Sequence, residues 1–407
     1  MNHVLAENLD EKCTSCSACF AVCPKNAIEF RLSDNGFYRP FLNEDRCIDC
    51  GLCKTVCAKY DDEILEDDGG AEYSCMSVKS ANKDILKTSS SGGACYEIAK
   101  LLLRDGYGII GVSYDHQKKE ALGVSFDNIA EFEKIRGSKY FQSDISEVLR
   151  KALKSGKKYA IFATPCQIYG IRKSIQKLKV EDHFVLVDIF CHGTPTVLLW
   201  KKYIEYEQKN NRGKEIKNIL FRSKAKGWHR FCTTFLYENT QKTSKIINDK
   251  FYTLFFGKDL FNEACYSCKF RSTLRYTDIR IGDFWGFRYD TDLEGVSCVV
   301  GASKVGKQII ERLDEKCVLK KNIQFTEVTA AQSYGEKHRI NTKRRNCLLE
   351  SLYDCDNDIQ DTFKIYKKNL GFKERLTHFK KNCIKAFPLR ISNYFKKLYH
   401  SKKYGNN

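Results

Sequence analysis

The chain has 407 residues, 42% of them hydrophobic and 13% aromatic, which predicts a globular protein of roughly two or three domains and excludes a disordered chain. Its first residues form no secretory signal and no apolar run is long enough to span a bilayer, so we expect a cytoplasmic protein. Twenty cysteines in that compartment favour metal or redox chemistry over disulfides.

The net charge of +18 is unevenly distributed along the chain. Residues 1–70 carry seven basic and fourteen acidic side chains, whereas residues 361–407 carry thirteen basic and two acidic ones. This asymmetry favours docking to a partner over a nucleic-acid groove, and we expect no nucleic-acid partner.

Two cysteine runs with the same spacing lie within residues 1–60, CTSCSACFAVCP and CIDCGLCKTVC. The spacing is typical of bacterial two-cluster ferredoxins, in which the fourth cysteine of each run binds the other cluster. Zinc knuckles, the alternative, rarely use four cysteines in one tight run. We therefore predict a domain with two 4Fe-4S clusters. The expected ligands are Cys13, Cys16, Cys19 and Cys57 for one cluster, and Cys47, Cys50, Cys53 and Cys23 for the other.

An acidic linker is expected over residues 61–88, followed by apolar strands that alternate with helices. The strands are YGIIGVSY, KYAIFA and HFVLVDIF, and their continuous apolar character predicts a parallel sheet covered on both faces. The predicted fold class is thus α+β or α/β, with a small ferredoxin domain before a larger mixed α/β body. We divide the body into residues 89–180 and 181–340, and expect a basic, helical tail over 341–407.

Four further cysteines could form a third metal site. Cys166 and Cys191 each lie just beyond a predicted strand, so both should emerge at the carboxyl edge of the sheet, where ligands bind. Cys265 and Cys268 form an isolated Cys-x-x-Cys pair, which lacks two of the four ligands that zinc or a cluster takes. Alternatively, these thiols are small buried hydrophobic groups. Eight other cysteines show no ligand spacing: Cys75, Cys95, Cys232, Cys298, Cys317, Cys347, Cys355 and Cys383.

The stretch SSSGGA precedes a predicted helix that begins near Ala94. The backbone N–H groups of such a turn can bind an anion or phosphate, or the turn can be an ordinary helix cap. The residues alone leave both interpretations open.

Five motifs in order carry a family resemblance: SSSGGA, RGSKYFQS, FATPCQIYG, DIFCHG, and a Cys-x-x-Cys pair followed by TDIRIGDFWG. Over about residues 1–330 the chain resembles the beta-subunit family of coenzyme F-420 hydrogenases and dehydrogenases. The resemblance implies bound FAD, and a 4Fe-4S cluster on Cys166, Cys191, Cys265 and Cys268. The residues that it implies at the flavin are Ser91, Gly92, Gly93, Gly137, Ser138, Lys139 and Tyr140.

The expected function is that of an iron–sulfur flavoprotein oxidoreductase. It would pass electrons between 4Fe-4S clusters, FAD and a hydride or electron partner, either a deazaflavin or another small molecule, and would meet a redox protein such as ferredoxin or another oxidoreductase subunit. No catalytic residue is predicted; His192 and Asp283 are the nearest polar candidates by motif. The alternatives are a non-catalytic electron-transfer subunit and, since similar chains occur beside such genes, an accessory redox protein of cell-surface polysaccharide biosynthesis.

Aromatic and aliphatic residues of the tail, 361–407, alternate with lysines in a helical rhythm that is broken at Pro388. Such a segment can lie on an anionic membrane surface, which would make the protein peripheral at the inner face of the membrane. The alternative is a helix that packs its aromatic side chains on the body. RNA binding ranks third, because no nucleic-acid-binding fold accompanies the charge.

Overall fold

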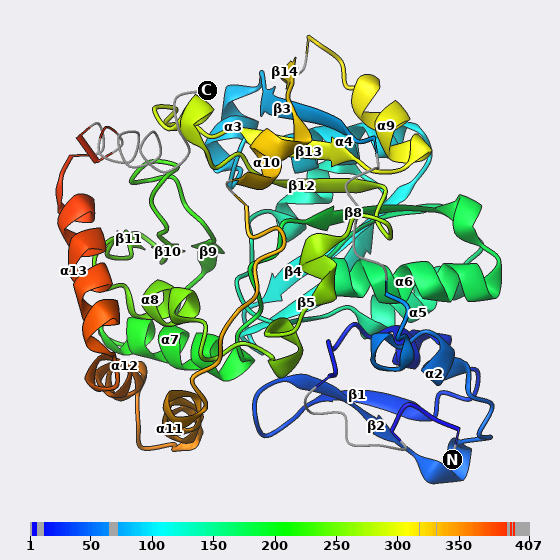
Figure 1. Cartoon of the computed structure of the whole chain (residues 1–407), viewed down its shortest axis with the longest axis horizontal. Helices are drawn as coiled ribbons and strands as arrows, with labels where there is room; N and C mark the ends of the chain where they lie inside the picture. Colours follow the sequence, from blue (N-terminus) through cyan, green and yellow to red (C-terminus); the bar gives the residue numbers. More distant parts are fainter. Residues whose placement is uncertain are drawn as a thin grey trace.

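The computed structural model consists of an N-terminal module, a large α/β body and a set of C-terminal helices (Figure 1). One of the cysteines without ligand spacing, Cys317, lies outside the described residues, as do parts of the predicted linker and tail. The structure describes residues 2–5, 12–64, 72–316, 318–330, 332–388, 391–392 and 394.

The N-terminal module is a small two-stranded sheet with short helices beside it. Strands β1 (Ile28–Leu32) and β2 (Tyr38–Leu42) pair antiparallel, and helices α1 (Ala18–Val22) and α2 (Leu52–Thr55) each follow cysteines of one run. The buried residues of its main core are Val4, Cys19, Phe20, Cys23, Ala27, Ile28 and Cys53. Because cysteines make up much of this small core, we infer that metal–sulfur bonds supply part of its stability.

Within the described residues, nine strands form the sheet of the body, in the order β14-β3-β13-β12-β8-β7-β4-β5-β6. The neighbours β12, β8, β7 and β4 pair in parallel, as the apolar runs predict, while antiparallel pairs on both sides make the sheet mixed. This confirms the predicted mixed α/β body. The strands are β3 (Ser74–Ser80), β4 (Gly108–Asp115), β5 (Glu120–Phe126), β6 (Ser143–Asp144), β7 (Tyr159–Phe162), β8 (Phe184–Ile189), β12 (Ile279–Asp283), β13 (Ser297–Gly301) and β14 (Val318–Asn322).

Part of the predicted linker is a strand of this sheet. Within residues 61–88, β3 pairs antiparallel with β13 and β14, and helix α3 (Lys83–Thr88) follows it. The strand is SCMSVKS, with one β-branched aliphatic residue and small polar residues inside the sheet, so its composition carries little strand signal.

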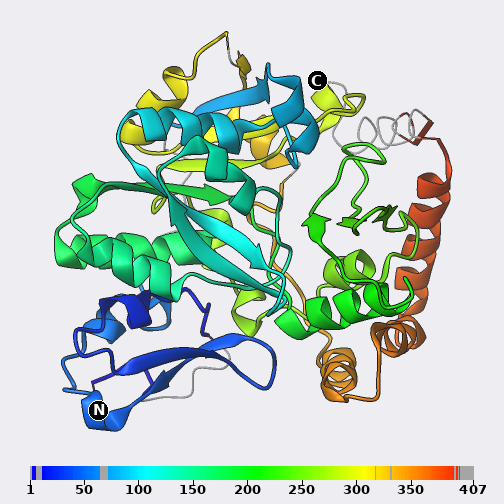
Figure 2. The same cartoon turned by 180° about the vertical axis from the view of Figure 1, so that it is seen from behind.

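Helices cover both faces of the sheet (Figures 1 and 2). On one face, α4 (Ala94–Arg104) and α9 (Lys304–Glu311) contribute Ile98, Leu102 and Ile310 to a common core with the strands. On the other, α5 (Ser146–Lys154) and α6 (Pro165–Leu178) bury Leu149, Ile168 and Ile171. A parallel sheet needs this double cover because both of its faces are apolar.

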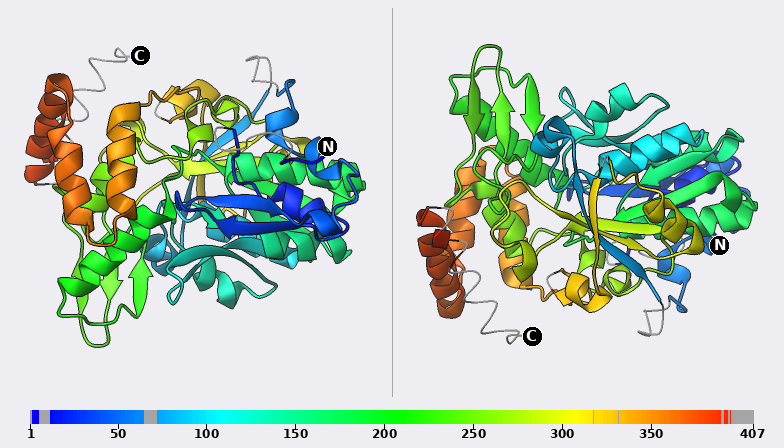
Figure 3. Two further views of the ribbon diagram at one scale, coloured as in Figure 1. Left: turned by 90° about the horizontal axis from the view of Figure 1, so that it is seen from below. Right: turned by 90° about the horizontal axis from the view of Figure 1, so that it is seen from above.

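A second lobe packs beside the carboxyl edge of the sheet. It contains a three-stranded sheet and an aromatic core that includes Trp200, Tyr203, Phe235 and Phe251. Helix α13 lies at the outer edge of the molecule (Figures 1 and 3). The elements are β9 (Asn218–Leu220), β10 (Thr234–Leu236), β11 (Gln241–Thr243), α7 (Val197–Lys209), α8 (Lys250–Gly257), α11 (Thr342–Tyr353), α12 (Ile359–Lys368) and α13 (Phe372–Ala386).

The remaining short helices are α10 (Phe325–Ala330) and the 3-10 turns Glu44–Arg46, Ala58–Tyr60, Ile129–Ile135, Glu181–His183, Glu263–Cys265, Lys269–Ser272 and Phe287–Tyr289. In the part of the chain that the structure describes, every helix is too short or too polar to cross a membrane.

Candidate cluster and cofactor sites

The first group of thiols combines three cysteines of the first run with the last cysteine of the second. Cys13, Cys16, Cys19 and Cys57 line one small space in the module. Burial raises the pKa of the Cys19 thiol, and the neighbouring thiols of Cys16 and Cys57 raise it further. Burial likewise raises the pKa of Cys57 to about 12. Sulfur atoms this close repel one another as thiolates, so a bound cation is needed to keep them ionised.

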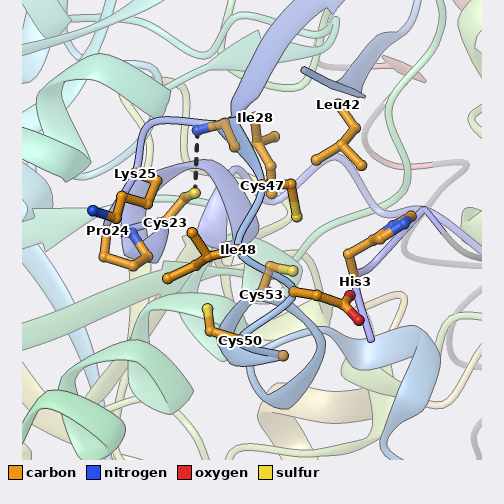
Figure 4. Close-up of a pocket in the computed structure, with 13 residues that line it drawn as sticks. His3, Cys23, Pro24, Lys25, Ile28, Leu42, Cys47, Ile48, Cys50 and Cys53 are labelled. Atoms are coloured by element: carbon orange, nitrogen blue, oxygen red, sulfur yellow. Dashed lines mark hydrogen bonds between the residues drawn. The ribbon is translucent and has the colours of Figure 1, made fainter. Parts of the chain in front are cut away.

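The second group of thiols combines three cysteines of the second run with the last cysteine of the first run. Figure 4 shows the sulfur atoms of Cys23, Cys47, Cys50 and Cys53 arranged around the same space. Cys23 Sγ accepts a hydrogen bond from the backbone N–H of Ala27 at 3.3 Å, and Cys53 Sγ accepts one from Val4 at 3.4 Å. Such N–H···S bonds tune the potential of clusters. The structure thus brings together the crossed sets predicted from the spacing.

The four remaining candidate ligands, Cys166, Cys191, Cys265 and Cys268, come together from three separate segments. Burial raises the pKa of the Cys166 thiol, and the other three thiols raise it further. Burial raises that of Cys191 to about 12, with added repulsion from Cys265 and Cys268. Four neighbouring sulfur atoms match the donor set of a cubane cluster.

The start of helix α6 positions Cys166. Pro165 occupies the first turn, and Thr164 forms a capping box with Gln167, so the helix begins immediately after strand β7. Cys166 lies in this first turn, with its Sγ 3.3 Å from Thr164 Oγ1. At another thiol of the group, Thr194 Oγ1 lies 3.8 Å from Cys265 Sγ.

The same helix contacts the N-terminal module. At Gly170, an added Cβ would lie 2.8 Å from Ala18 Cβ and 2.9 Å from Cys16 Sγ. Gly170 follows Cys166 by four residues, or about 6 Å of helix rise. One turn of α6 therefore separates the first thiol group from the third.

A cavity of about 640 Å³ lies at the carboxyl edge of the sheet. It is bounded by the ends of β7, β8 and β12, by the Ser–Gly turn before α4 and by the second lobe. Its volume lies in the range typical of ligand pockets. Cys191 lines it, so the third thiol group and the cavity share a residue.

Both segments predicted to contact a flavin reach this cavity. Gly92 is not among the lining residues: an added Cβ there would lie 2.2 Å from the carbonyl oxygen of Val78 and 2.5 Å from the nitrogen of Ser297. Glycine is therefore required at this position for close packing of the turn against β3 and β13. The other six line the cavity: Ser91, Gly93, Gly137, Ser138, Lys139 and Tyr140.

The ammonium group of Lys139 is committed to the backbone. Its Nζ donates to the carbonyl oxygens of Val112, Ile135 and Arg136 at 2.8, 3.0 and 3.0 Å. Burial lowers the pKa of Lys139 to about 7. These three hydrogen bonds fix the turn that carries Gly137 and Ser138.

The opposite wall of the cavity is aromatic and comes from distant parts of the chain. Phe231, Phe255, Phe256 and Trp285 line it, and Trp285 stacks on Trp228 with ring centroids 5.0 Å apart. No sequence motif indicated the three phenylalanines, because only the packing of the second lobe brings them to the sheet.

The buried guanidinium of Arg222 supports this wall. Its Cζ lies 3.9 Å from the ring centroid of Phe231, and its Nη1 donates to the carbonyl oxygen of Trp228 at 2.7 Å. Asp283 lines the cavity and accepts a hydrogen bond from Trp228 Nε1 at 2.6 Å. The Asp283 carboxylate also lies 3.8 Å from Arg222, which offsets its charge.

His192, the other polar candidate, lines the cavity next to Cys191. Burial lowers the pKa of its imidazole to about 3, with a further decrease from Lys258, so the ring is neutral at pH 7. Together with Glu336 and His338 it forms a group of possible metal ligands. Lys258 Nζ already lies 2.5 Å from Glu336 and 3.2 Å from His338, so an ammonium occupies this group.

Two family models match the chain. Residues 12–60 match the 4Fe-4S dicluster domain, and residues 156–326 match the C terminus of the coenzyme F420 hydrogenase/dehydrogenase beta subunit. Residues 156–326 therefore belong to the coenzyme F420 hydrogenase/dehydrogenase beta-subunit family. This confirms the resemblance seen in the motifs. All four cysteines of the third group lie within the matched residues, whereas the predicted flavin contacts precede them.

Among solved structures, a chain of the xenon-derivatised F420-reducing [NiFe] hydrogenase complex from Methanosarcina barkeri is similar at 19% sequence identity and a TM-score of 0.47. The match covers 76% of this chain and 98% of that chain. No curated protein sequence matches. The family models thus show a two-cluster 4Fe-4S domain over residues 12–60 and a segment of an oxidoreductase-subunit family over residues 156–326.

Proposed function

We propose that this protein is an iron–sulfur flavoprotein oxidoreductase, which passes electrons between its two-cluster module, a third 4Fe-4S cluster and FAD. The observation that carries the proposal is the position of Cys191, which belongs to the third thiol group and also lines the cavity. A redox centre there would touch whatever occupies the cavity.

The arrangement of the thiol groups supports a linear order of sites. The second group contains the exposed Cys50, so it is the one open to a partner. The first group contacts Gly170 of α6 through Cys16, and the third begins at Cys166 of the same helix. The order from the surface inward is therefore second group, first group, third group, cavity.

The residues around the cavity fit a flavin. The turn Ser91–Gly93 opens α4, and N–H groups at a helix N-terminus bind phosphate. The aromatic wall offers an apolar surface to a ring system. A bound flavin would couple the one-electron chemistry of clusters to two-electron hydride chemistry.

The protein's own groups would shape that chemistry. Lys139 holds the Gly137–Ser138 turn in place, and the neutral imidazole of His192 can form a hydrogen bond at the cavity wall without adding charge.

Two kinds of partner follow from this function. One is a redox protein, such as ferredoxin or another oxidoreductase subunit, that docks where Cys50 is exposed. The other is a small-molecule hydride partner at the cavity, for which a deazaflavin is the first candidate because of the family to which residues 156–326 belong.

Anaerobic purification with assays of iron, acid-labile sulfide and flavin tests the proposal. We expect about twelve irons and one FAD per chain, because each cubane carries four irons. About eight irons would contradict the third cluster. Clusters without bound flavin would favour the non-catalytic electron-transfer subunit.

A matched pair of cysteine variants sharpens the iron assay. Cys166→Ser should lose about four irons, since it removes one ligand of a cubane. Cys347→Ser, in helix α11 and outside all three thiol groups, should retain the full content. Equal iron in the two variants would exclude Cys166 as a ligand.

A further inference from the structure

Helix α13 is attached to the body through its polar face. At its N-terminal end, Arg344 Nη1 and Nη2 donate to the Glu374 carboxylate at 2.9 and 3.0 Å. At its C-terminal end, Arg230 donates to the carbonyl oxygens of Lys385 and Phe387, both at 2.7 Å. Between them, His378 Nε2 lies 3.1 Å from the hydroxyl of Tyr366. These contacts fix which side of the helix faces outward.

The outward side carries the apolar stripe. Phe372, Leu376 and Phe379 recur at the i, i+4 and i+7 positions of one helix face and are 82%, 44% and 67% exposed. Cys383, one turn further along the same face, is also exposed. A surface helix of a globular protein normally turns such a stripe toward the core, so α13 has the opposite orientation.

Basic residues flank this stripe. Lys373, Arg375 and Lys380 are exposed on its two sides, and Lys381 is exposed nearby. The helix contains five basic residues and one acidic residue, and that acidic residue, Glu374, is paired with Arg344. The sequence after the helix adds five more lysines and arginines and no acidic residue. The charge that complements this surface is negative.

Of the partners that combine apolar and anionic surfaces, a lipid membrane fits best. Basic helices with exposed aromatic side chains insert them at the boundary of headgroups and acyl chains, while their lysines attract anionic lipids. A second copy of this chain that docks through the same helix would place two basic surfaces together, which like-charge repulsion opposes. Single-stranded RNA would contact the charges and stack bases on the phenylalanines, but it would leave Leu376 without a role, and no nucleic-acid-binding fold accompanies the charge in the described residues.

We propose that α13 binds the surface of an anionic lipid membrane, with Phe372, Leu376 and Phe379 inserted at the interface. The two alternatives for the tail apply to different helices: Phe363 and Tyr366 of α12 pack on the core, whereas Phe372 and Phe379 of α13 are exposed. Figures 1 and 3 show α13 at the outer edge of the molecule, away from the N-terminal module. Membrane binding would leave the exposed second thiol group accessible. The inference is independent of the proposed redox chemistry.

Flotation of the intact, cluster-containing protein with lipid vesicles tests this inference. We expect binding to vesicles of mixed phosphatidylglycerol and phosphatidylcholine, weaker binding at high salt, and little binding to pure phosphatidylcholine. The double variant Phe372→Ser/Phe379→Ser should bind at least about tenfold more weakly, because it removes the two most exposed apolar side chains of the stripe. Leu319→Ser, at a 66% exposed position on strand β14, is the matched control and should bind as the wild type does.

Iron content and unfolding temperature show whether each variant is folded. Unchanged binding of the folded double variant, or absence of wild-type binding to the mixed vesicles, overturns the proposal. Equal binding to both kinds of vesicle overturns its electrostatic part. A dimer in sedimentation that the double substitution dissociates, without vesicle binding, would assign the stripe to a second copy of the chain. Retention of the protein on RNA, without binding to vesicles, would mean that the stripe binds nucleic acid.

Discussion

Arg280 and Asp188 form an ion pair inside the sheet. Asp188 lies three residues before Cys191 in the chain. Arg280 lies on β12 and Asp188 opposite it on the parallel strand β8. Their two hydrogen bonds measure 2.7 and 2.6 Å, and both side chains are 2% exposed. Burial raises the pKa of the Asp188 carboxyl, although Arg280 opposes the increase. The pair holds together the strands that position the loop with Cys191.

Removal of the arginine alone should be costly. Arg280→Ala would leave the Asp188 charge buried without its partner, and we expect a loss of about 3–5 kcal/mol in the free energy of unfolding. Arg312→Ala, which removes a 53% exposed partner of Asp105, should cost at most about 1 kcal/mol. Denaturant unfolding of both variants measures the difference, and equal losses would refute this role of the buried pair.

Gly170 provides a second single-residue test. Gly170→Ala would place a methyl group against Ala18 and Cys16, so we expect a cost of about 1–3 kcal/mol from overpacking and a decrease in bound iron. Gly371→Ala serves as the control, because the nearest atom to its added Cβ would lie 3.5 Å away. Thermal unfolding and iron assays compare the two. A stable, fully loaded Gly170→Ala protein would mean that the module and helix α6 separate more easily than this contact indicates.

Among the elements, α6 and α13 have the clearest functions. Helix α6 carries Cys166 in its first turn and Gly170 in the next, so its packing links the module to the body. Helix α13 is held by polar contacts and turns its apolar stripe outward. For both helices, the orientation of one face determines which groups the helix can contact. The presence of a helix alone would not determine this.

The attachment of α13 should depend on pH. Hydrogen bonds from Arg344 lower the pKa of Glu374 below its usual value in the folded protein. The stabilisation is therefore present above the usual Glu pKa, about 4.3, and is lost as the pH falls through the lower folded value. Hydrogen exchange of α13 amides should accelerate in that acidic range. In Glu374→Gln the exchange should lack this transition, and an identical pH profile in both proteins would exclude Glu374 as its source.

At the scale of the whole molecule, the module and the body differ in what stabilises them. The main core of the module includes the thiols of Cys19, Cys23 and Cys53, whereas the cores of the body and second lobe are built from aliphatic and aromatic side chains. A small core with few apolar residues depends on bound metal for its stability.

Removal of iron should therefore destabilise the N-terminal module more than the body. After chelation under anaerobic conditions, we expect residues 12–60 to lose protection from hydrogen exchange, because repulsion among the thiolates is no longer offset. Helix α4, in the apolar core of the body, should retain most of its protection. Protection that persists in both regions would show that the module folds without its clusters.

Much of the fold follows from local sequence pattern. The cysteine runs predict the two-cluster domain because their ligands lie a few residues apart, and the dicluster family model confirms it. Strands β7 and β8 appear where continuous apolar runs predicted them. Strand β3 was missed, since its short sequence has few β-branched residues and is recognisable only from its pairing with β13 and β14.

The candidate site could be predicted only in part. The parallel connection of two strands was enough to place Cys166 and Cys191 at one edge of the sheet. The route that brings Cys265 and Cys268 to them could not be obtained from spacing. The three phenylalanines of the aromatic wall had no signal in the sequence, because the wall forms where the second lobe meets the sheet.

By itself, the sequence determined what depends on neighbours along the chain: the two-cluster module, the central strands and the amphipathic character of the tail. Tertiary structure decided what depends on contact between distant segments, namely the gathering of the third thiol group beside the cavity and the outward orientation of α13. The physical reason is that periodicity specifies which residues share a face. Only the packing of whole elements determines what that face meets.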